Sequence, residues 1–253
     1  LPPGQDIFYR VRFQDLSSPT ILSEAVTGRF RTAPDDARSV SFVWSGDTAG
    51  QGWGIDESRG GMRTYATMHH NRPDFFVHCG DSIYADCPIE RDLTLPGGGC
   101  WRNLVTEEKA QIAQTLAQFR GNYKYTLLDA NLRAFNAAVP VLATWDDHEV
   151  TNDWWPTRTI DEAGYRERSA LQLAARAGRA FHEYMPTRQT LAEPGRVYRK
   201  IAHGPLLDVF LIDMRSYRGP NGATAEPAPL LGAKQLAWLK GELGASRATW
   251  KVI

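Results

Sequence analysis

Three carboxylates in this sequence each follow a short apolar run, where together they could hold a metal ion. They are Asp47 after residues 40–44, Asp81 after residues 75–78 and Asp147 after residues 139–144. If the runs are neighbouring strands, these side chains gather at one sheet edge, where open α/β proteins bind ligands. Carboxylates that close repel one another unless a cation lies between them. The pattern therefore predicts a metal site.

A single aspartate after a strand is more often a helix cap or a turn residue. Here two of the three carboxylates lie in dense polar clusters, at residues 80–86 and 145–153. A binding domain without metal would leave the repulsion among the carboxylates unexplained. We therefore favour the metal site over both alternatives.

The elements that would position these residues are short buried strands that alternate with helices. Strands are predicted at four nearly continuous apolar runs: 40–44, 75–78, 139–144 and 206–212. Helices are predicted where apolar residues recur every three or four positions: around 112–119, 171–185 and 236–243. Thr106 is the expected N-cap of the first helix. This order is typical of a layered α/β (α+β) domain.

The first 34 residues follow a different pattern. Residues 8–13 and 28–32 alternate apolar and polar side chains around a turn-rich segment, which predicts a half-buried antiparallel pair. We assign residues 1–34 to the last strands of a small all-β domain and residues 35–253 to the main domain. The chain begins without Met and closes on what reads as half of a buried strand, so we expect an internal fragment whose main domain is incomplete at its C-terminus.

Composition excludes several classes of protein. The 253 residues carry 29 basic and 29 acidic side chains, and the net charge of zero disfavours a nucleic-acid or anionic-membrane surface. Hydrophobic (42%) and charged (23%) fractions are ordinary for a globular domain. No stretch approaches the roughly 18 apolar residues of a transmembrane helix, and no export signal is visible. Gly-rich residues 97–99 and Pro-rich residues 219–229 predict loops, and nothing indicates an oligomeric state.

Three motifs resemble those of a known family. Gly-Asp-x-x-Tyr-Ala-Asp at 80–86 is similar to the second motif of purple-acid-type, calcineurin-like metallophosphatases. Trp-Asp-Asp-His-Glu-Val at 145–150 resembles the third motif of PhoD-like alkaline phosphatases, and residues 211–218 resemble their Asp-x-Arg-x-Tyr-Arg segment. The resemblance covers essentially the whole chain. It implies a calcineurin-like β-sandwich core flanked by helices, preceded by the tail of an immunoglobulin- or fibronectin-like domain.

Carried over by position, the resemblance implies a site with two or more metal ions. Asp47 would hold the first metal, where many PhoD-like proteins have Cys, and Asp81 would bridge two metals. Tyr84 would bind the first metal as a phenolate, which favours Fe³⁺, while Asp147 would bind Ca²⁺, Zn²⁺, Mn²⁺ or Fe²⁺ as the second. His148 would stand beside the substrate oxygen as charge stabiliser or general acid. The family's remaining nitrogen ligands would follow the end of this chain.

Several neighbouring residues keep two interpretations. Asn152 could be a metal ligand or an amide that ties its own loop. Arg215 could meet a phosphate oxygen or be the buried partner of Asp213. We expect Asp146 to orient His148 or an arginine.

Asp86 and the cysteines are given structural roles. Asp86 is expected to tie down its own loop, and Cys79 to be a small buried apolar residue. Cys87 and Cys100 bracket a loop rich in Pro and Gly. A disulfide between them would close about 14 residues and contribute about 3 kcal/mol in the chain-entropy model, while two free thiols are the alternative. The bridge would suit the periplasmic or secreted location that the resemblance implies.

The predicted function is metal-dependent hydrolysis of small-molecule phosphate esters, monoesters or diesters, by a dinuclear site that activates hydroxide. The alternative is a catalytically inactive metal-binding or interaction protein on the same scaffold. A complete Asp-Asp-His-Glu block argues against that alternative, because a site without turnover has no physical reason to keep a histidine among carboxylates.

Overall fold

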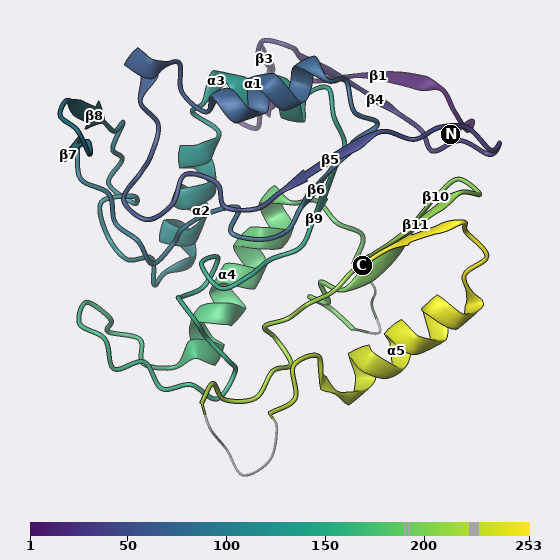
Figure 1. Ribbon diagram of the computed structural model, residues 1–253. Helices are drawn as coiled ribbons and strands as arrows, with labels where there is room; N and C mark the ends of the chain where they lie inside the picture. The colour runs from purple at the N-terminus through teal and green to yellow at the C-terminus, as the bar shows by residue number, and fades with distance from the viewer. Residues whose placement is uncertain (190, 192, 223–227) are drawn as a thin grey trace.

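Two three-stranded sheets form the centre of the protein (Figure 1). The computed structural model describes residues 1–189, 191, 193–222 and 228–253. The first sheet is parallel throughout, in the order β5 (Phe42–Ser45), β6 (Phe75–His78), β9 (Val141–Ala143). The second pairs β11 (Leu207–Leu211) with antiparallel β10 (Arg199–His203) and parallel β12 (Trp250–Val252). The four predicted strands are therefore confirmed.

The two sheets share one apolar cluster. Phe75 and Val77 of β6 lie in this cluster with Leu207, Val209 and Leu211 of β11. Every residue of β6 and β11 is buried, as their nearly continuous apolar sequences predict. Each large apolar side chain buried here contributes about 1.5–3 kcal/mol. This packing holds the carboxyl edge of the parallel sheet in place.

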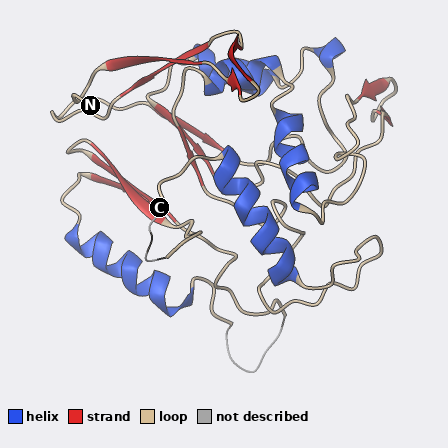
Figure 2. Cartoon of the chain, turned by 180° about the vertical axis from the view of Figure 1, so that it is seen from behind, coloured by secondary structure: helices blue, strands red, loops and turns tan. Residues whose placement is uncertain are grey.

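Helices pack in pairs against the sheets (Figures 1 and 2). The pairs in contact are α1 (Arg63–His70) with α3 (Ala130–Asn136), and α2 (Leu116–Thr126) with α4 (Ala170–Tyr184). Helix α5 (Gly232–Ala245) leads into β12, and a 3₁₀ turn, η1, spans Glu57–Arg59. None of the helices in the described ranges has the length and apolarity that crossing a bilayer requires.

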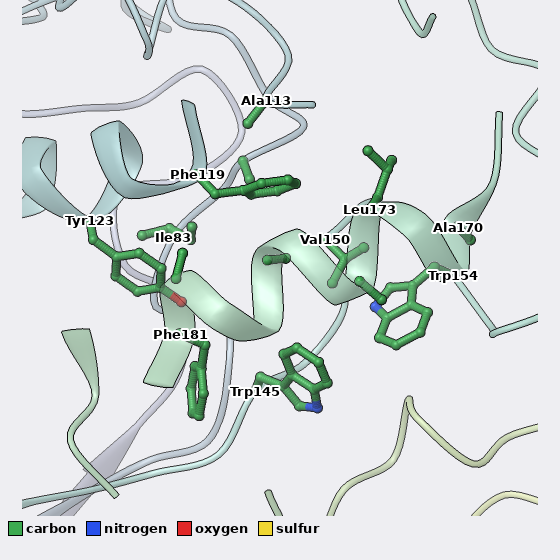
Figure 3. Packing of buried hydrophobic residues seen from close by; sticks show 14 of the residues in the cluster. Ile83, Ala113, Phe119, Tyr123, Trp145, Val150, Trp154, Ala170, Leu173 and Phe181 are labelled. Carbon is green, nitrogen blue, oxygen red and sulfur yellow. The ribbon is translucent and has the colours of Figure 1, made fainter. Parts of the chain in front are cut away.

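The largest core surrounds α4 (Figure 3). Phe119 and Tyr123 of α2 pack there with Leu173 and Phe181 of α4. Trp145 and Trp154, from the loop after β9, complete this cluster, and their rings meet edge to face with centroids 5.7 Å apart. The third polar cluster of the sequence is therefore anchored at two points in the core.

Helix α2 begins later than predicted. Its N-cap is Thr115, whose hydroxyl accepts a hydrogen bond from Gln118 N. The Gln118 side-chain oxygen in turn accepts a hydrogen bond from Thr115 N, which completes a capping box. Thr106 instead begins an isolated turn, in which its hydroxyl accepts from Lys109 N at 3.4 Å and its carbonyl accepts from Lys109 and Ala110. The predicted cap at Thr106 is wrong because the complete capping box at Thr115 satisfies more free backbone N–H groups.

The N-terminal strands pair as predicted but are less buried. Strand β1 (Asp6–Val11) runs antiparallel to β4 (Val26–Arg31), and β2 (Gln14–Asp15) pairs with β3 (Ser18–Leu22). Phe8 is 75% exposed on the same face as Arg10, whereas Ile7 and Phe30 on the opposite face are half-buried, and Arg29 N donates to Ala137 O just after α3. Trp250, in the strand expected to be buried, is 68% exposed at the edge of its sheet.

The predicted disulfide is absent, since Cys79, Cys87 and Cys100 are all free thiols. Cys100 lies in a hairpin formed by β7 (Asp92–Thr94) and β8 (Cys100–Arg102), which encloses the predicted glycine loop. The hairpin register sets Cys100 opposite Thr94, and its sulfur lies 3.5 Å from an Asp92 carboxylate oxygen rather than at Cys87. Cys79 is exposed, not buried. Of the predicted loop 219–229, residues 223–227 lie outside the described ranges.

Candidate metal centre

The loops after β5, β6 and β9 meet at the carboxyl edge of the parallel sheet. Carboxylate oxygens of Asp81 and Asp147 and a ring nitrogen of His148 all lie within 4.8 Å of one another. Both carboxylates are buried, and His148 is half-buried. Parallel strands bring these residues together because their carboxyl ends share one edge. Three of the predicted site residues therefore form one cluster of potential ligands.

Asp47 and Tyr84 form the neighbouring part of the site. The Tyr84 hydroxyl donates a hydrogen bond of 2.5 Å to Asp47 Oδ1. Burial raises the pKa of Tyr84 above its ordinary value, and the carboxylates of Asp47 and Asp81 raise it further. The phenol therefore stays protonated beside these carboxylates unless a strong Lewis acid replaces its proton.

The two aspartates that follow β5 and β6 have an unusual backbone conformation. Asp47 has φ 60° and Asp81 has φ 54°, in the left-handed region that costs a non-glycine residue about 1–3 kcal/mol. Backbone bonds link the two loops, because Asp47 N donates to Gly80 O at 3.2 Å and Thr48 N donates to Asp81 O at 2.8 Å. Strain of this kind concentrates at functional sites.

Gly80 allows the second and third loops to touch. It has φ 111°, and a Cβ placed there would lie 2.6 Å from Asp146 Cβ and 2.7 Å from the Asp146 nitrogen. Only glycine tolerates both this conformation and this approach. The spacing between Asp81 and Asp147 therefore depends on the missing side chain at Gly80.

Glu149 ties the same two loops together. Its buried carboxylate accepts bonds from Asp81 N (3.1 Å), Ser82 N (2.6 Å), Ser82 Oγ (2.7 Å) and Asp146 N (2.8 Å). Burial raises the pKa of Glu149, while these donors lower it. Glu149 stands in the Asp-Asp-His-Glu block, but its role in joining the loops could not be predicted from the motif.

Asp86 holds His148 in position. Its Oδ1 lies 2.8 Å from His148 Nδ1, and its Oδ2 accepts from Asn152 N at 2.6 Å. The expectation that Asp86 ties its own loop is therefore wrong, because its partners belong to the loop after β9. Burial alone lowers the pKa of His148, but Asp86 raises it overall to about 9, with Asp147 and Asp81 contributing. The Tyr84 ring stacks on the imidazole, with centroids 4.2 Å apart.

Arg215 contacts the third loop rather than Asp213. Its Nε donates to Asp146 Oδ1 at 2.6 Å, its Nη2 lies 3.3 Å from Asp147 Oδ1, and its Nη1 lies 3.7 Å from Asp153 Oδ1. Asp146 thus holds an arginine, as expected.

Asp213 has other partners. It accepts from the backbone N–H groups of Arg215 and Ser216 and from Trp145 Nε1. The interpretation of Arg215 as its buried ion-pair partner is therefore wrong, because the guanidinium faces the carboxylates of the loop after β9.

Asn152 is exposed, and its side-chain nitrogen lies 3.5 Å from an Asp153 carboxylate oxygen. Its backbone N–H, not its amide, ties the loop through Asp86. A ligand role for the Asn152 side chain stays a prediction.

A buried lysine that was not predicted from the sequence, Lys109, supports the Tyr84 loop. Lys109 Nζ donates to the carbonyl oxygens of Tyr84 at 2.6 Å and Cys87 at 3.2 Å. Burial lowers the pKa of Lys109 to about 8. In the sequence, Lys109 is a single basic residue just before a predicted helix. That pattern does not predict its contact with Tyr84, which lies 25 residues away along the chain.

His78 is the last residue of β6. The residue is buried, and its Nε2 lies 2.9 Å from Thr48 Oγ1. Burial lowers the pKa of His78 to about 4, so the ring is neutral at physiological pH. It supports the loop after β5 from within the core.

The electrostatics of the cluster fit a bound cation. Burial and the charge of Glu149 raise the pKa of Asp81 to about 7, and Asp147 and Asp146 add to the effect. A cation between the carboxylates would remove this cost. Carboxylate, phenol and imidazole groups are all established donors to transition metals. The residues present therefore suit a metal centre.

Comparison with known proteins gives consistent matches. Residues 42–253 match the family model described as PhoD-like phosphatase. The chain is 30% identical over 267 residues to alkaline phosphatase D of Bacillus subtilis (strain 168), with all of this chain and 42% of that protein covered. A solved structure titled "Structure of PhoD" is 28% identical, with a TM-score of 0.72 over 96% of this chain and 46% of that one. The chain thus spans less than half the length of these relatives.

Proposed function

The chain belongs to the PhoD-like phosphatase family and has a mixed α/β fold resembling the solved PhoD structure, and we propose that it hydrolyses phosphate esters at a centre of two or more metal ions. The observation that carries the proposal is the meeting of Asp81, Asp147 and His148 within 4.8 Å. The adjoining Tyr84–Asp47 pair supports it.

Each ligand has a proposed place. Asp47 and Tyr84 would hold Fe³⁺, Asp81 would bridge, and Asp147 would hold Ca²⁺, Zn²⁺, Mn²⁺ or Fe²⁺, with Asn152 as a candidate further ligand. The short Tyr84–Asp47 contact supports a shared ion, because both oxygens already point at one another. Bound metals would supply Lewis-acid activation of the phosphoryl group and of the attacking water.

His148 is the proposed charge stabiliser or general acid. Asp86 holds Nδ1, which fixes the ring and leaves Nε2 as the nitrogen available to a substrate oxygen. The pKa of about 9 keeps the imidazole protonated at neutral pH. A protonated ring can stabilise charge on the phosphoryl group or give its proton to the departing alkoxide.

Arg215 is the proposed second contact to the phosphoryl group. Its Nη1 is buried and makes no hydrogen bond to any residue that the structure describes. Its other nitrogens are fixed by Asp146 and Asp147, so the guanidinium is positioned in advance. A phosphate oxygen would satisfy the remaining donor.

The substrates we propose are small-molecule phosphate monoesters or diesters, and the proposed location is periplasmic or secreted. The apolar cluster shared by the two sheets supports a calcineurin-like sandwich core. The antiparallel pairing of β1 with β4 and of β2 with β3 supports our assignment of residues 1–34 to the tail of a further all-β domain.

Metal analysis followed by ester assays tests the proposal. The full-length protein should contain at least two equivalents of metal and should hydrolyse 4-nitrophenyl phosphate or bis(4-nitrophenyl) phosphate. Activity should fall on chelation and return on reloading. Full metal content without turnover of either ester would favour the inactive metal-binding alternative, and absence of metal would overturn the assignment altogether.

The identity of the first metal can be read from visible light absorption. A phenolate bound to Fe³⁺ absorbs in the visible range by charge transfer, whereas a zinc or calcium phenolate is colourless. We expect the metal-loaded protein to be coloured and Tyr84→Phe to bleach or shift the band strongly. Tyr165→Phe is a matched control, because that hydroxyl contacts Thr151 rather than a candidate ligand. An iron-containing protein whose spectrum ignores Tyr84→Phe would exclude Tyr84 as a ligand.

A further inference from the structure

A cavity of about 550 Å³ adjoins the candidate metal centre on the side of Asp47. Its wall runs from Asp47 past Trp53 to Arg59, Arg63 and Trp101. This volume is within the range of small-molecule sites. Asp47 belongs both to the wall of the cavity and to the candidate metal centre, where it accepts the bond from Tyr84.

Arg59 is fixed in this wall by three contacts. Its Nη2 donates to Cys100 O at 3.1 Å, its Nε lies 3.4 Å from Asp56 Oδ2, and its guanidinium lies 5.7 Å from the Trp101 ring centroid. Asp56 is itself 1% exposed and accepts from Arg102 N at 2.9 Å. A buried carboxylate thus holds Arg59 in place, while the guanidinium remains partly exposed to the cavity.

Two arginines and one carboxylate line the cavity. Arg63, the first residue of α1, is exposed and forms no ion pair with any residue in the described ranges. Among the described residues that line the cavity, Asp47 alone carries a carboxylate, and it is a candidate metal ligand. Asp56 pairs with Arg59 from behind the wall, so Arg63 carries the charge that no acid in the described ranges neutralises, while the Arg59 guanidinium keeps free N–H donors.

Aromatic surface lies between these charges and the metal centre. Trp53 and Trp101 meet edge to face, with ring centroids 5.7 Å apart, and Trp53 is 37% exposed. Indole rings offer a large, rigid apolar surface at low entropic cost. The wall thus combines a surface for a carbon skeleton with cations beyond it.

We propose that this cavity binds the alcohol part of the ester and selects alcohols that carry a second anionic group, such as a further phosphate. The inference rests on the proposed phosphatase function, because it assigns the alcohol side of the same reaction. Guanidinium forks match phosphate oxygens, and the tryptophans pack against the carbons between the two charged groups. In the hydrolysis, a water oxygen forms a bond to phosphorus while the bond from phosphorus to the alcohol oxygen breaks. A proton from the water ends on the alcohol oxygen, so inorganic phosphate leaves together with an alcohol that keeps its second phosphate.

Paired synthetic substrates test the inference on the full-length, metal-loaded protein. The probes are monophosphates and bisphosphates of straight-chain diols with two to six carbons, so that the departing oxygen is always a primary alkoxide. We expect kcat/KM to favour the bisphosphate by about tenfold or more at one chain length, since a charge-assisted contact contributes about 1.5 kcal/mol or more. Arg59→Gln and Arg63→Gln should each lower this ratio by about 5- to 10-fold.

Two further variants and two outcomes complete the test. Arg59→Lys keeps the charge but loses the fork, so its ratio should fall between those of wild type and Arg59→Gln. Arg10→Gln, at an exposed position of β1, removes the same charge and should leave both rates unchanged. Monophosphate hydrolysis without a bisphosphate preference, or a preference that survives both Arg59→Gln and Arg63→Gln, overturns the inference. Failure to hydrolyse any ester would overturn the proposed function instead.

Discussion

The loops after β5, β6 and β9 and the strands at the N-terminus use polar groups in opposite ways. In the loops, buried carboxylates bond to backbone of distant segments, as Glu149 does with Asp81, 68 residues away along the chain. In β1 and β4 the backbone bonds to itself in a regular ladder, and nearly all side chains face solvent. Hydrogen bonds from side chains therefore hold the first region together, and backbone hydrogen bonds hold the second.

This difference predicts where substitutions should affect stability and function most. A ladder bond survives almost any change of side chain, whereas a buried carboxylate that loses its partner leaves unsatisfied donors at a cost of about 1–3 kcal/mol each. We therefore expect effects that range from loss of function in the loops to almost nothing in the N-terminal strands.

The largest effect is expected at Asp81. Asp81→Ala should abolish metal binding and lower hydrolysis by more than about 10³-fold, because a bridging carboxylate serves two cations. Metal content by mass spectrometry and kcat/KM check this expectation. Asp15→Ala, in strand β2, is the matched control and should change neither quantity. An Asp81→Ala protein that keeps two equivalents of metal would exclude the bridging role.

His148 should come next. His148→Ala should lower turnover by roughly 10²–10⁴-fold, the scale for losing acid–base help, and leave the metal content intact. His69→Ala, at the end of α1, supplies the control. Loss of metal in His148→Ala would make His148 a ligand and would withdraw its proposed role as charge stabiliser or general acid.

A smaller effect is expected at Asp86, which acts through His148. Asp86→Asn should cost about 10-fold in kcat, the range seen for groups that orient a functional histidine. Asp86 raises the pKa of His148, so the variant should lose the protonated ring at lower pH. The alkaline limb of the pH–rate profile should therefore move toward lower pH. An unchanged profile with reduced kcat would mean that Asp86 only stabilises the loops.

The smallest effect is expected in the N-terminal strands. Phe8 is 75% exposed, so Phe8→Ser should change the free energy of unfolding by less than about 0.5 kcal/mol. Thermal melting checks this, with fully buried Phe135→Ser as the contrasting variant. A large loss of stability in Phe8→Ser would show that another part of the natural protein covers this strand pair.

The sequence predicted the parallel sheet well because its strands are buried on both faces. Residues 75–78 form a nearly continuous apolar run, and the strand has those same bounds. The gathering of Asp81 and Asp147 followed from strand order alone. Exposure in the N-terminal strands was beyond prediction, since alternation indicates which side chains share a face and not whether anything covers that face.

The supporting contacts of the site could not be predicted. Lys109 reaches the Tyr84 carbonyl and Asp86 reaches His148 across gaps in sequence that no local pattern spans. The disulfide expectation failed for a similar reason, because hairpin register rather than spacing decides where Cys100 points. The motifs therefore predicted the candidate site residues, but the residues that support them depend on tertiary packing that the motifs do not encode.

The close approach at Gly80 limits how far this site can be re-engineered. Even alanine there would force the second and third loops apart, because its Cβ would meet the backbone of Asp146. The distance between Asp81 and Asp147 is thus set by the contact between the two main chains, and substituting other side chains cannot change it. If Asp47 and Tyr84 are ligands as proposed, changing them would alter metal preference, but a library randomised at Gly80 should return only glycine among its active members.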